Sequence, residues 1–238
     1  AIDMVRDGEA DAALSAGNTG ALMVGSLMHL GRLDGVDRPA IVYPLPNISA
    51  PGFSLLVDAG ANAECKASHL LGFARMGTVY MKTAFGIEAP RVGLINIGTE
   101  ETKGTEMLKE AYRLLKESGL NFIGNVEARE IPAGAADVLV CDGFTGNIVL
   151  KLTEGVAYST LHAFKDLLME DMVGKMGGLI LKGKLSGIKD KFDYSKYGGA
   201  PILGVKGPVF KMHGNSSANA VEYSVARAAA AVEAGFAQ

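Results

Sequence analysis

Short apolar runs that end on glycine, asparagine or aspartate recur along this sequence, and each is followed by a longer stretch with helical periodicity. In DAALSAGNTGALMVG, residues 11–25, the apolar run stops at Gly17-Asn18-Thr19-Gly20 and a stretch of small residues follows at once. Strands that alternate with helical crossovers are typical of a parallel sheet with helices on both faces. The sequence therefore predicts an α/β fold, a three-layer α/β/α doubly wound and mostly parallel sheet.

The same patterns predict the individual elements. Strands are predicted over residues 11–16, 39–44, 53–58, 91–97, 120–124, 136–141 and 208–212. Helices are predicted over residues 19–31, 67–85, 102–118, 144–170 and 215–235, with Thr99 and Ser216-Ser217 placed as caps. Neither a repeat nor a linker is evident, so we expect one α/β domain over residues 1–238 that begins within a helix and is incomplete at its N-terminal side.

Charge and composition exclude several classes of protein. A formal net charge of −3 over 238 residues argues against a nucleic-acid partner held by a whole-protein basic field. The two cysteines, Cys65 and Cys141, are far apart and lack metal-type spacing, which favours a reducing, cytoplasmic compartment. No apolar run reaches the roughly 20 residues of a membrane span, and the first residues do not have a signal-peptide pattern.

Six of the predicted strands lead into turns of similar composition, rich in glycine, asparagine, threonine and aspartate. These turns cover residues 17–20, 58–62, 98–104, 124–127, 142–147 and 213–217. Ligands collect at the carboxyl ends of strands in doubly wound sheets, and free N–H groups at a helix start favour an anion such as phosphate. We therefore expect the turns to converge on a small oxyanion, although the same residues also suit ordinary turns and caps.

Competing nucleotide and nucleophile motifs are not found. Gly20-Ala-Leu-Met-Val-Gly25 lacks the Lys-Ser/Thr of a Walker loop, and neither G-x-G-x-x-G after a strand nor G-x-S-x-G occurs. A carboxylate cluster for magnesium is not evident either. The sequence therefore predicts a small phosphate-like ligand, no cofactor and no metal.

Several polar residues in these turns have two interpretations each. Asp58 and Asp142 follow apolar strands, where each could act as a base or cap the following helix. Lys103 is close to any anion at its turn or is a solvated lysine, and Glu127 faces the cleft or pairs with a neighbouring arginine. His213 is suited to donate a proton near neutral pH, or packs as an ordinary histidine at a strand end.

The segment 165–211 differs in charge from the rest of the chain. It has nine lysines against five acidic residues, or +4, which leaves −7 for the remainder of the total of −3. Apolar residues at helical spacing between these lysines predict an amphipathic helical hairpin at about residues 165–196. Such a hairpin could contact anionic lipid or an acidic protein, or it could serve dimerisation.

Seven strings in this order identify a family resemblance: SAGNTGAL, DAGAN, GLINIGTEETKG, FIGNVEAR, DGFTGN, YGGAPILGVKGPV and HGNSSANA. The chain resembles the phosphate acyltransferase PlsX family of bacterial phospholipid synthesis, without that family's N-terminal portion. The resemblance implies a fold similar to phosphotransacetylases and isopropylmalate-type dehydrogenases. It also implies attack of inorganic phosphate on the thioester of a long-chain acyl carrier protein, a homodimer, and peripheral association with the inner membrane surface.

The resemblance and the turn chemistry together give a set of expected site residues. The expected catalytic residues are Lys103, Asp142, Asn147 and His213. Phosphate is expected on Asn18, Thr19, Gly20 and Lys103, the oxyanion on the 142–147 turn and Asn125, and the leaving thiolate near His213. The further expected binding residues are Asp58, Gly60, Asn62, Gly98, Thr99, Gly104, Glu127, Gly143, Gly146 and Gly214. The carrier protein or membrane is expected on Lys182, Lys184, Lys189 and Lys191.

Two other functions fit the sequence. A phosphate acetyl- or butyryltransferase acting on coenzyme A thioesters would share the fold and the turns. A noncatalytic module that binds lipid or protein through the basic hairpin would share only the hairpin.

Overall fold

The computed structural model describes residues 1–192 and 198–235, and the side chains of residue 182 and residues 184–192 lie outside that description. The strands are β1 (Ala13–Ser15), β2 (Ala40–Pro46), β3 (Phe53–Val57), β4 (Val92–Asn96), β5 (Phe122–Glu127), β6 (Val138–Val140), β7 (Ala200–Leu203) and β8 (Val209–Lys211). The helices are α1 (Ile2–Arg6), α2 (Thr19–His29), α3 (Ala67–Phe85), α4 (Glu106–Lys116), the 3-10 helix η1 (Ala128–Ala133), α5 (Gly143–Met169), α6 (Met172–Phe192) and α7 (Ala218–Glu233).

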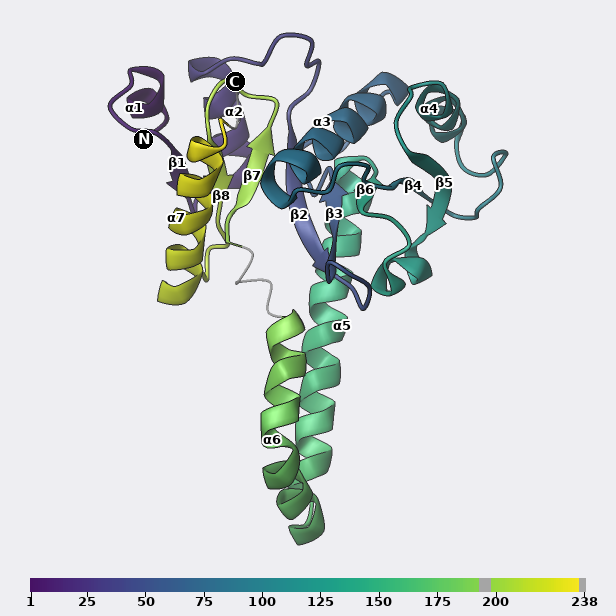
Figure 1. Cartoon of the computed structure of the whole chain (residues 1–238), viewed down its shortest axis with the longest axis vertical. Helices are drawn as coiled ribbons and strands as arrows, with labels where there is room; N and C mark the ends of the chain where they lie inside the picture. The colour runs from purple at the N-terminus through teal and green to yellow at the C-terminus, as the bar shows by residue number, and fades with distance from the viewer. Residues whose placement is uncertain (193–197, 236–238) are drawn as a thin grey trace.

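The strands form one sheet in the order β1-β8-β7-β2-β3-β6-β4-β5, with helices on both faces (Figure 1). The pairs β1/β8, β3/β6, β6/β4 and β4/β5 are parallel, and the pairs β8/β7, β7/β2 and β2/β3 are antiparallel. The predicted α/β class with a mostly parallel sheet is therefore confirmed.

The three antiparallel pairings divide the turns between two edges of the sheet. Three reversals separate β8 from β3, so β8 and its parallel neighbour β1 run opposite to β3, β6, β4 and β5. The turns after β1 and β8 therefore lie at the opposite edge from the turns after the other four strands. The six turns therefore do not all lie at one edge of the sheet, as they would in a fully parallel sheet.

Most predicted elements are present, and the differences have local causes. The helix predicted over 67–85 is found with those bounds, whereas β7 was missed because its four residues, all buried, follow two glycines and contain Pro201. Ser217 caps α7 as expected, since its hydroxyl accepts a hydrogen bond from the N–H of Ala220. Thr99 does not cap α4; that helix begins later, and Thr105 is its cap.

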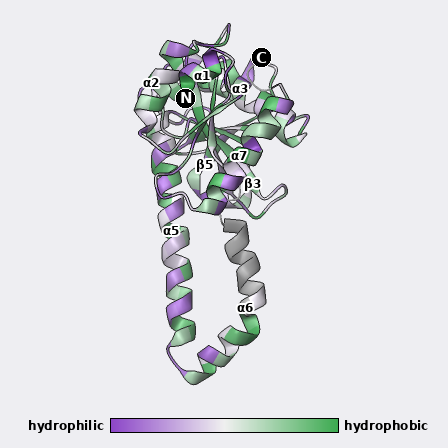
Figure 2. Ribbon diagram, turned by 90° about the vertical axis from the view of Figure 1, so that its left-hand side faces the viewer, coloured by the Kyte–Doolittle hydropathy of each residue, from purple (hydrophilic) through white to green (hydrophobic). Residues whose placement is uncertain are grey.

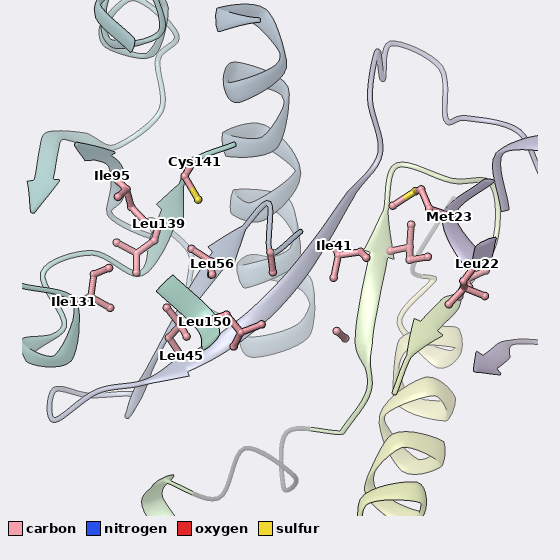
Figure 3. Close-up of a cluster of buried hydrophobic side chains, with 14 of the residues drawn as sticks. Leu22, Met23, Ile41, Leu45, Leu56, Ile95, Ile131, Leu139, Cys141 and Leu150 are labelled. Carbon is pink, nitrogen blue, oxygen red and sulfur yellow. The ribbon is translucent and has the colours of Figure 1, made fainter. Parts of the chain in front are cut away.

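The two faces of the central strands belong to two separate cores. Leu56 of β3 and Leu139 of β6 pack in the core that includes Leu150 of α5 (Figure 3). Leu55 of β3 packs in the other core, which includes Phe73 of α3. Successive residues of a strand point to opposite faces of the sheet. Helices α5 and α3 therefore cover opposite faces of the central strands.

Helices α5 and α6 form a hairpin that projects from the sheet (Figures 1 and 2). The 27 residues of α5 span about 40 Å, and its buried residues all lie near its start. Its first arm begins at Gly143, well before the expected boundary near residue 165. Among the described helices, none has the length and apolar content needed to cross a membrane.

Candidate active site

A cavity of about 540 Å³ lies between α5 and the part of the molecule formed by β7, β8 and α7. We call it the α5 cavity. Residues from α2, β2, the end of β3, α5, β8 and the start of α7 line it, including Thr19, Ile41, Tyr43, Ala59, Asn147, Lys151, Tyr158, Lys211, His213 and Ser217. The cavity therefore joins turns that lie at opposite edges of the sheet.

Three of the expected site residues line this cavity, namely Thr19, Asn147 and His213. Each comes from a different turn, because they follow β1, β6 and β8 respectively. The Nδ1 atom of His213 accepts a hydrogen bond from the N–H of Asn215 at 3.3 Å. In the neutral imidazole the proton is therefore on Nε2, where it can donate a hydrogen bond. A Cβ atom on Gly214 would make only ordinary van der Waals contact, because its nearest neighbour, the carbonyl oxygen of Ala16, would lie 3.9 Å away.

The turn after β1 begins helix α2. The side-chain oxygen of Asn18 accepts a hydrogen bond from the N–H of Ala21 at 3.0 Å and caps the helix. A Cβ atom on Gly20 would lie 3.3 Å from that same oxygen. Asn18 and Gly20 therefore shape the helix start, and Thr19 is the residue of this turn that lines the α5 cavity.

Asp58 organises the turn after β3 and is itself fully buried. Its carboxylate accepts hydrogen bonds from the N–H groups of Ile41, Gly60, Ala61 and Asn62, at 2.6–3.3 Å, and from the side-chain amide of Asn62 at 2.9 Å. Burial nevertheless raises the pKa of Asp58, because desolvation outweighs these donors. The N–H groups of this turn are directed to Asp58, which gives Gly60 and Asn62 a structural role in this chain.

The turn after β6 packs closely against the Asp58 turn. The carboxylate of Asp142 caps α5, since it accepts hydrogen bonds from the N–H of Thr145 at 2.8 Å and from its hydroxyl at 3.1 Å. A Cβ atom on Gly143 would lie 2.7 Å from the backbone nitrogen of Asn62, and one on Gly146 would lie 1.9 Å from the carbonyl oxygen of Asp58. Both glycines are thus required for the close contact that brings Asn147 into the α5 cavity.

The thiols near these turns are not activated. Burial raises the pKa of Cys65 to about 11, and the pKa of the fully buried Cys141 is also raised by burial. Both side chains therefore stay protonated at neutral pH, and thiols rather than thiolates are poor nucleophiles.

The turns after β4 and β5 form a separate polar cluster outside the α5 cavity. The side-chain amide of Asn96 donates to Asn125 Oδ1 and to the carbonyl oxygen of Lys103, both at 3.1 Å, and Asn125 donates to the carbonyl oxygen of Glu100 at 2.8 Å. Gly104 has φ of +89° and Asn96 Oδ1 lies 2.6 Å from its Cβ position, so a glycine is needed there. Gly98 packs on the stem of Lys103.

Lys103 and the Asn18 turn follow strands that lie far apart in the sheet. Six inter-strand steps separate β4 from β1 in the sheet, which corresponds to roughly 29 Å, and the carboxyl ends of these strands lie at opposite edges. Of the four residues expected around one phosphate, Asn18, Thr19, Gly20 and Lys103, only Thr19 lines the α5 cavity. Thr99 lies in the same turn after β4 as Lys103.

Glu127 pairs with its neighbour Arg129, at 2.6 Å, which is the structural one of its two expected interpretations. The side chains of Lys182, Lys184, Lys189 and Lys191 lie outside the described residues.

Two lysines of the cavity were missed by the sequence analysis. Lys151 lies four residues after Asn147 on α5, and its ammonium forms an ion pair with Glu154 at 2.6 Å. Lys211 ends β8, and its ammonium donates a hydrogen bond to the carbonyl oxygen of Met212. Burial, and then the nearby charge of Lys151, lower the pKa of Lys211. The i, i+4 spacing from Asn147 was the available signal for Lys151, since residues four apart share a helix face.

Comparison with known proteins places this chain in a family. A family model described as "Fatty acid synthesis protein" matches residues 1–238. The phosphate acyltransferase of Alkaliphilus oremlandii is 53% identical over 229 residues, which are 95% of this chain and 67% of that relative. The chain belongs to the phosphate acyltransferase family. The phosphate acyltransferase of a Geobacillus species is 50% identical over 94% of this chain, and the chain spans about two thirds of the length of both relatives.

Solved structures of other acyl-transfer enzymes share the fold. A phosphotransacetylase from Streptococcus pyogenes matches with a TM-score of 0.63 and 20% sequence identity. The match covers 98% of this chain and 65% of that protein. The EutD phosphotransacetylase from Staphylococcus aureus matches with a TM-score of 0.58 and 18% sequence identity, over 97% of this chain and 65% of that protein. At these identities the likeness establishes the fold alone.

Proposed function

We propose that this chain transfers a long-chain acyl group from acyl carrier protein to inorganic phosphate, which gives acyl phosphate for bacterial phospholipid synthesis. The observation that carries the proposal is the α5 cavity, into which three separate turns bring Thr19, Asn147 and His213 in a member of the phosphate acyltransferase family. Hydroxyl, amide and imidazole groups are neutral donors that suit a phosphate and a developing oxyanion.

In the proposed step a phosphate oxygen forms a bond to the thioester carbonyl carbon, and the carbon–sulfur bond then breaks. The carbonyl oxygen carries negative charge in between, for which the side-chain amide of Asn147 is the proposed donor. The carrier leaves as a thiolate, which takes a proton from water or from the imidazolium form of His213. Phosphate held beside the thioester converts a bimolecular encounter into an attack within one complex.

The test is turnover of the purified chain with a palmitoyl carrier-protein thioester and phosphate. Release of carrier thiol is followed with a thiol reagent, and acyl phosphate is trapped with hydroxylamine as the hydroxamate. Equal amounts of thiol and hydroxamate, both dependent on phosphate, are expected. Thiol release without hydroxamate would identify a thioesterase, and consumption of neither would favour the noncatalytic binding module.

A second candidate is acyl transfer from coenzyme A thioesters, which the fold shared with phosphotransacetylases favours. The same assay with acetyl-, butyryl- and palmitoyl-coenzyme A separates the two. A kcat/KM at least about tenfold higher for the carrier-protein thioester supports the first function, since this ratio measures discrimination.

We further propose that the chain works as a cytoplasmic homodimer at the inner membrane surface, through the hairpin. Large apolar side chains are exposed along it, including Leu152, Val156, Met172, Leu179 and Ile180. Exposed apolar surface of this extent marks an interaction site. Light scattering is expected to give twice the chain mass, and replacement of Lys182, Lys184, Lys189 and Lys191 by glutamate is expected to weaken sedimentation with anionic liposomes. A monomer, or unchanged sedimentation, would contradict the corresponding part.

A further inference from the structure

We infer that the α5 cavity is an amphiphile site, in which Lys151 and Lys211 bind a phosphate or phosphonate head and the next turns of α5 bind the acyl chain. The inference rests on the proposed function, because the amphiphile it names is the product of that reaction, an acyl phosphate. It adds two cations and an acyl-chain path that the sequence analysis did not assign.

The first support is the order of residues on the wall of the cavity. Seven residues of α5 line it, at positions 147, 150, 151, 154, 157, 158 and 161. This i, i+3, i+4, i+7 spacing is one continuous face of the helix, about 21 Å long. The face is not uniform. Three of its first four residues are polar, namely Asn147, Lys151 and Glu154, with Leu150 between them, and Ala157, Tyr158 and Leu161 follow. The face therefore changes from mainly polar to mainly apolar along the helix axis.

The second support is the charge at the polar end. Lys151 is paired with Glu154, whereas Lys211 forms no ion pair within the described part of the chain. One positive charge is therefore in excess there, and both lysines line the same cavity. Burial, and then the charge of Lys151, lower the pKa of Lys211. Like charges that approach in a partly desolvated cavity repel each other, and an anion between them removes that cost.

The third support is the apolar end, which has the form of a path for a chain. Tyr158 is 64% exposed and Leu161 is 37% exposed, although both line a concave wall. Burial of such side chains against an alkyl chain is favourable in proportion to the apolar area covered. A ligand with an anionic head and a long alkyl tail uses both ends of the face, whereas free phosphate uses only the first.

The experiment measures binding of two probes to the full chain by titration calorimetry, with ethylphosphonate as the head alone and octylphosphonate as the head with a tail. Octylphosphonate is expected to bind at least about tenfold more tightly than ethylphosphonate, because of the added apolar burial. Lys211→Met is expected to weaken both probes about tenfold, and Lys211→Arg is expected to restore most of the affinity. Lys206→Met, which removes an exposed lysine paired with Asp34, is the matched control.

The tail is tested separately on α5. Leu161→Asp is expected to weaken octylphosphonate at least about fivefold and to leave ethylphosphonate unchanged, because a carboxylate then faces the alkyl chain. Ser159→Asp places the same charge 200° around the same helix, on an exposed residue outside the cavity lining, and is expected to change neither affinity.

Each outcome bears on one proposal. If Lys211→Met and Lys206→Met bind both probes equally, the head site is refuted, and equal binding of the two probes to the unchanged chain refutes the tail path. If the chain turns over the carrier thioester but gives either of these binding results, the proposed function is supported and the amphiphile site is refuted. Lysine-dependent octylphosphonate binding without turnover supports the amphiphile site and contradicts the proposed function.

Discussion

Replacement of Gly146 by alanine sets two effects of opposite sign against each other. Gly146 lies in the first turn of α5, and alanine is favoured over glycine in a helix by about 1 kcal/mol. The new Cβ atom, however, would lie 1.9 Å from the carbonyl oxygen of Asp58 and 3.1 Å from the sulfur of Cys141. The helix start and the β3 turn must separate by about 1 Å, which places the overpacking cost near the upper end of its usual range, about 3 kcal/mol. The expected net loss is about 2 kcal/mol in the free energy of unfolding.

Urea unfolding followed by circular dichroism measures this difference. With an m value of about 3 kcal/mol per molar, Gly146→Ala is expected to lower the midpoint by about 0.7 M. Gly155→Ala in the same helix is the control, because its Cβ position has nothing within 4 Å. That variant is expected to raise the midpoint by about 0.2–0.3 M through helix propensity alone. If the two alanine variants shift the midpoint in the same direction, the close-contact argument for the DGFTGN string is refuted.

Three further predictions concern single groups. Asp58→Asn should lower the free energy of unfolding by about 3 kcal/mol at pH 8 in urea titrations, because a donor then faces the N–H groups of the turn. The folded state raises the pKa of Asp58 above 3.8, so the stabilising contribution of Asp58 is complete below pH 3.8 and declines as the pH rises through the raised pKa. The difference in free energy of unfolding between the unchanged chain and Asp58→Asn should therefore narrow as the pH rises. A difference that widens with pH would contradict the burial argument. Asn18→Ala should cost about 1 kcal/mol in thermal unfolding by loss of the α2 cap, and an unchanged Tm would remove that role. Lys103→Met should leave the KM for phosphate within about twofold in the turnover assay, and a larger rise would return Lys103 to the phosphate site.

The class of the fold could be predicted because periodicity and turn composition are local properties of the sequence. The α3 helix is the clearest example, since its predicted and observed bounds, 67–85, agree. Strand direction is not local. The antiparallel pairings of β2 and β7 depend on short contacts such as Ile41 with Ile202, and nothing within either segment encodes the reversal. The turns after β1, β3, β6 and β8 nevertheless contribute residues to the α5 cavity. The turns after β4 and β5 do not line it, because these two strands lie at the far side of the sheet from β1 and β8.

The kinds of residue at the candidate site could be predicted from the sequence, but not which residues would line the cavity together. Thr19, Asn147 and His213 were found because glycine-rich turns expose donors next to them. The turn at 58–62 has the same composition, yet its N–H groups are directed to a carboxylate of its own chain. Lys211 was missed because a lysine at the end of a weak strand gives no signal until the fold places it in the lining of the same cavity as Lys151.

Helix α5 is both a wall of the cavity and an arm of the projecting hairpin, with no loop between the two. The close packing of Gly143 and Gly146 against the Asp58 turn holds the first turn of α5 in place, so the helix can tilt only as a rigid unit about that end. A tilt of a few degrees moves the far tip by several ångströms over a length of about 40 Å, and the same tilt changes the width of the cavity. A displacement of the hairpin tip, for example on binding to another surface, is therefore coupled to the width of the α5 cavity.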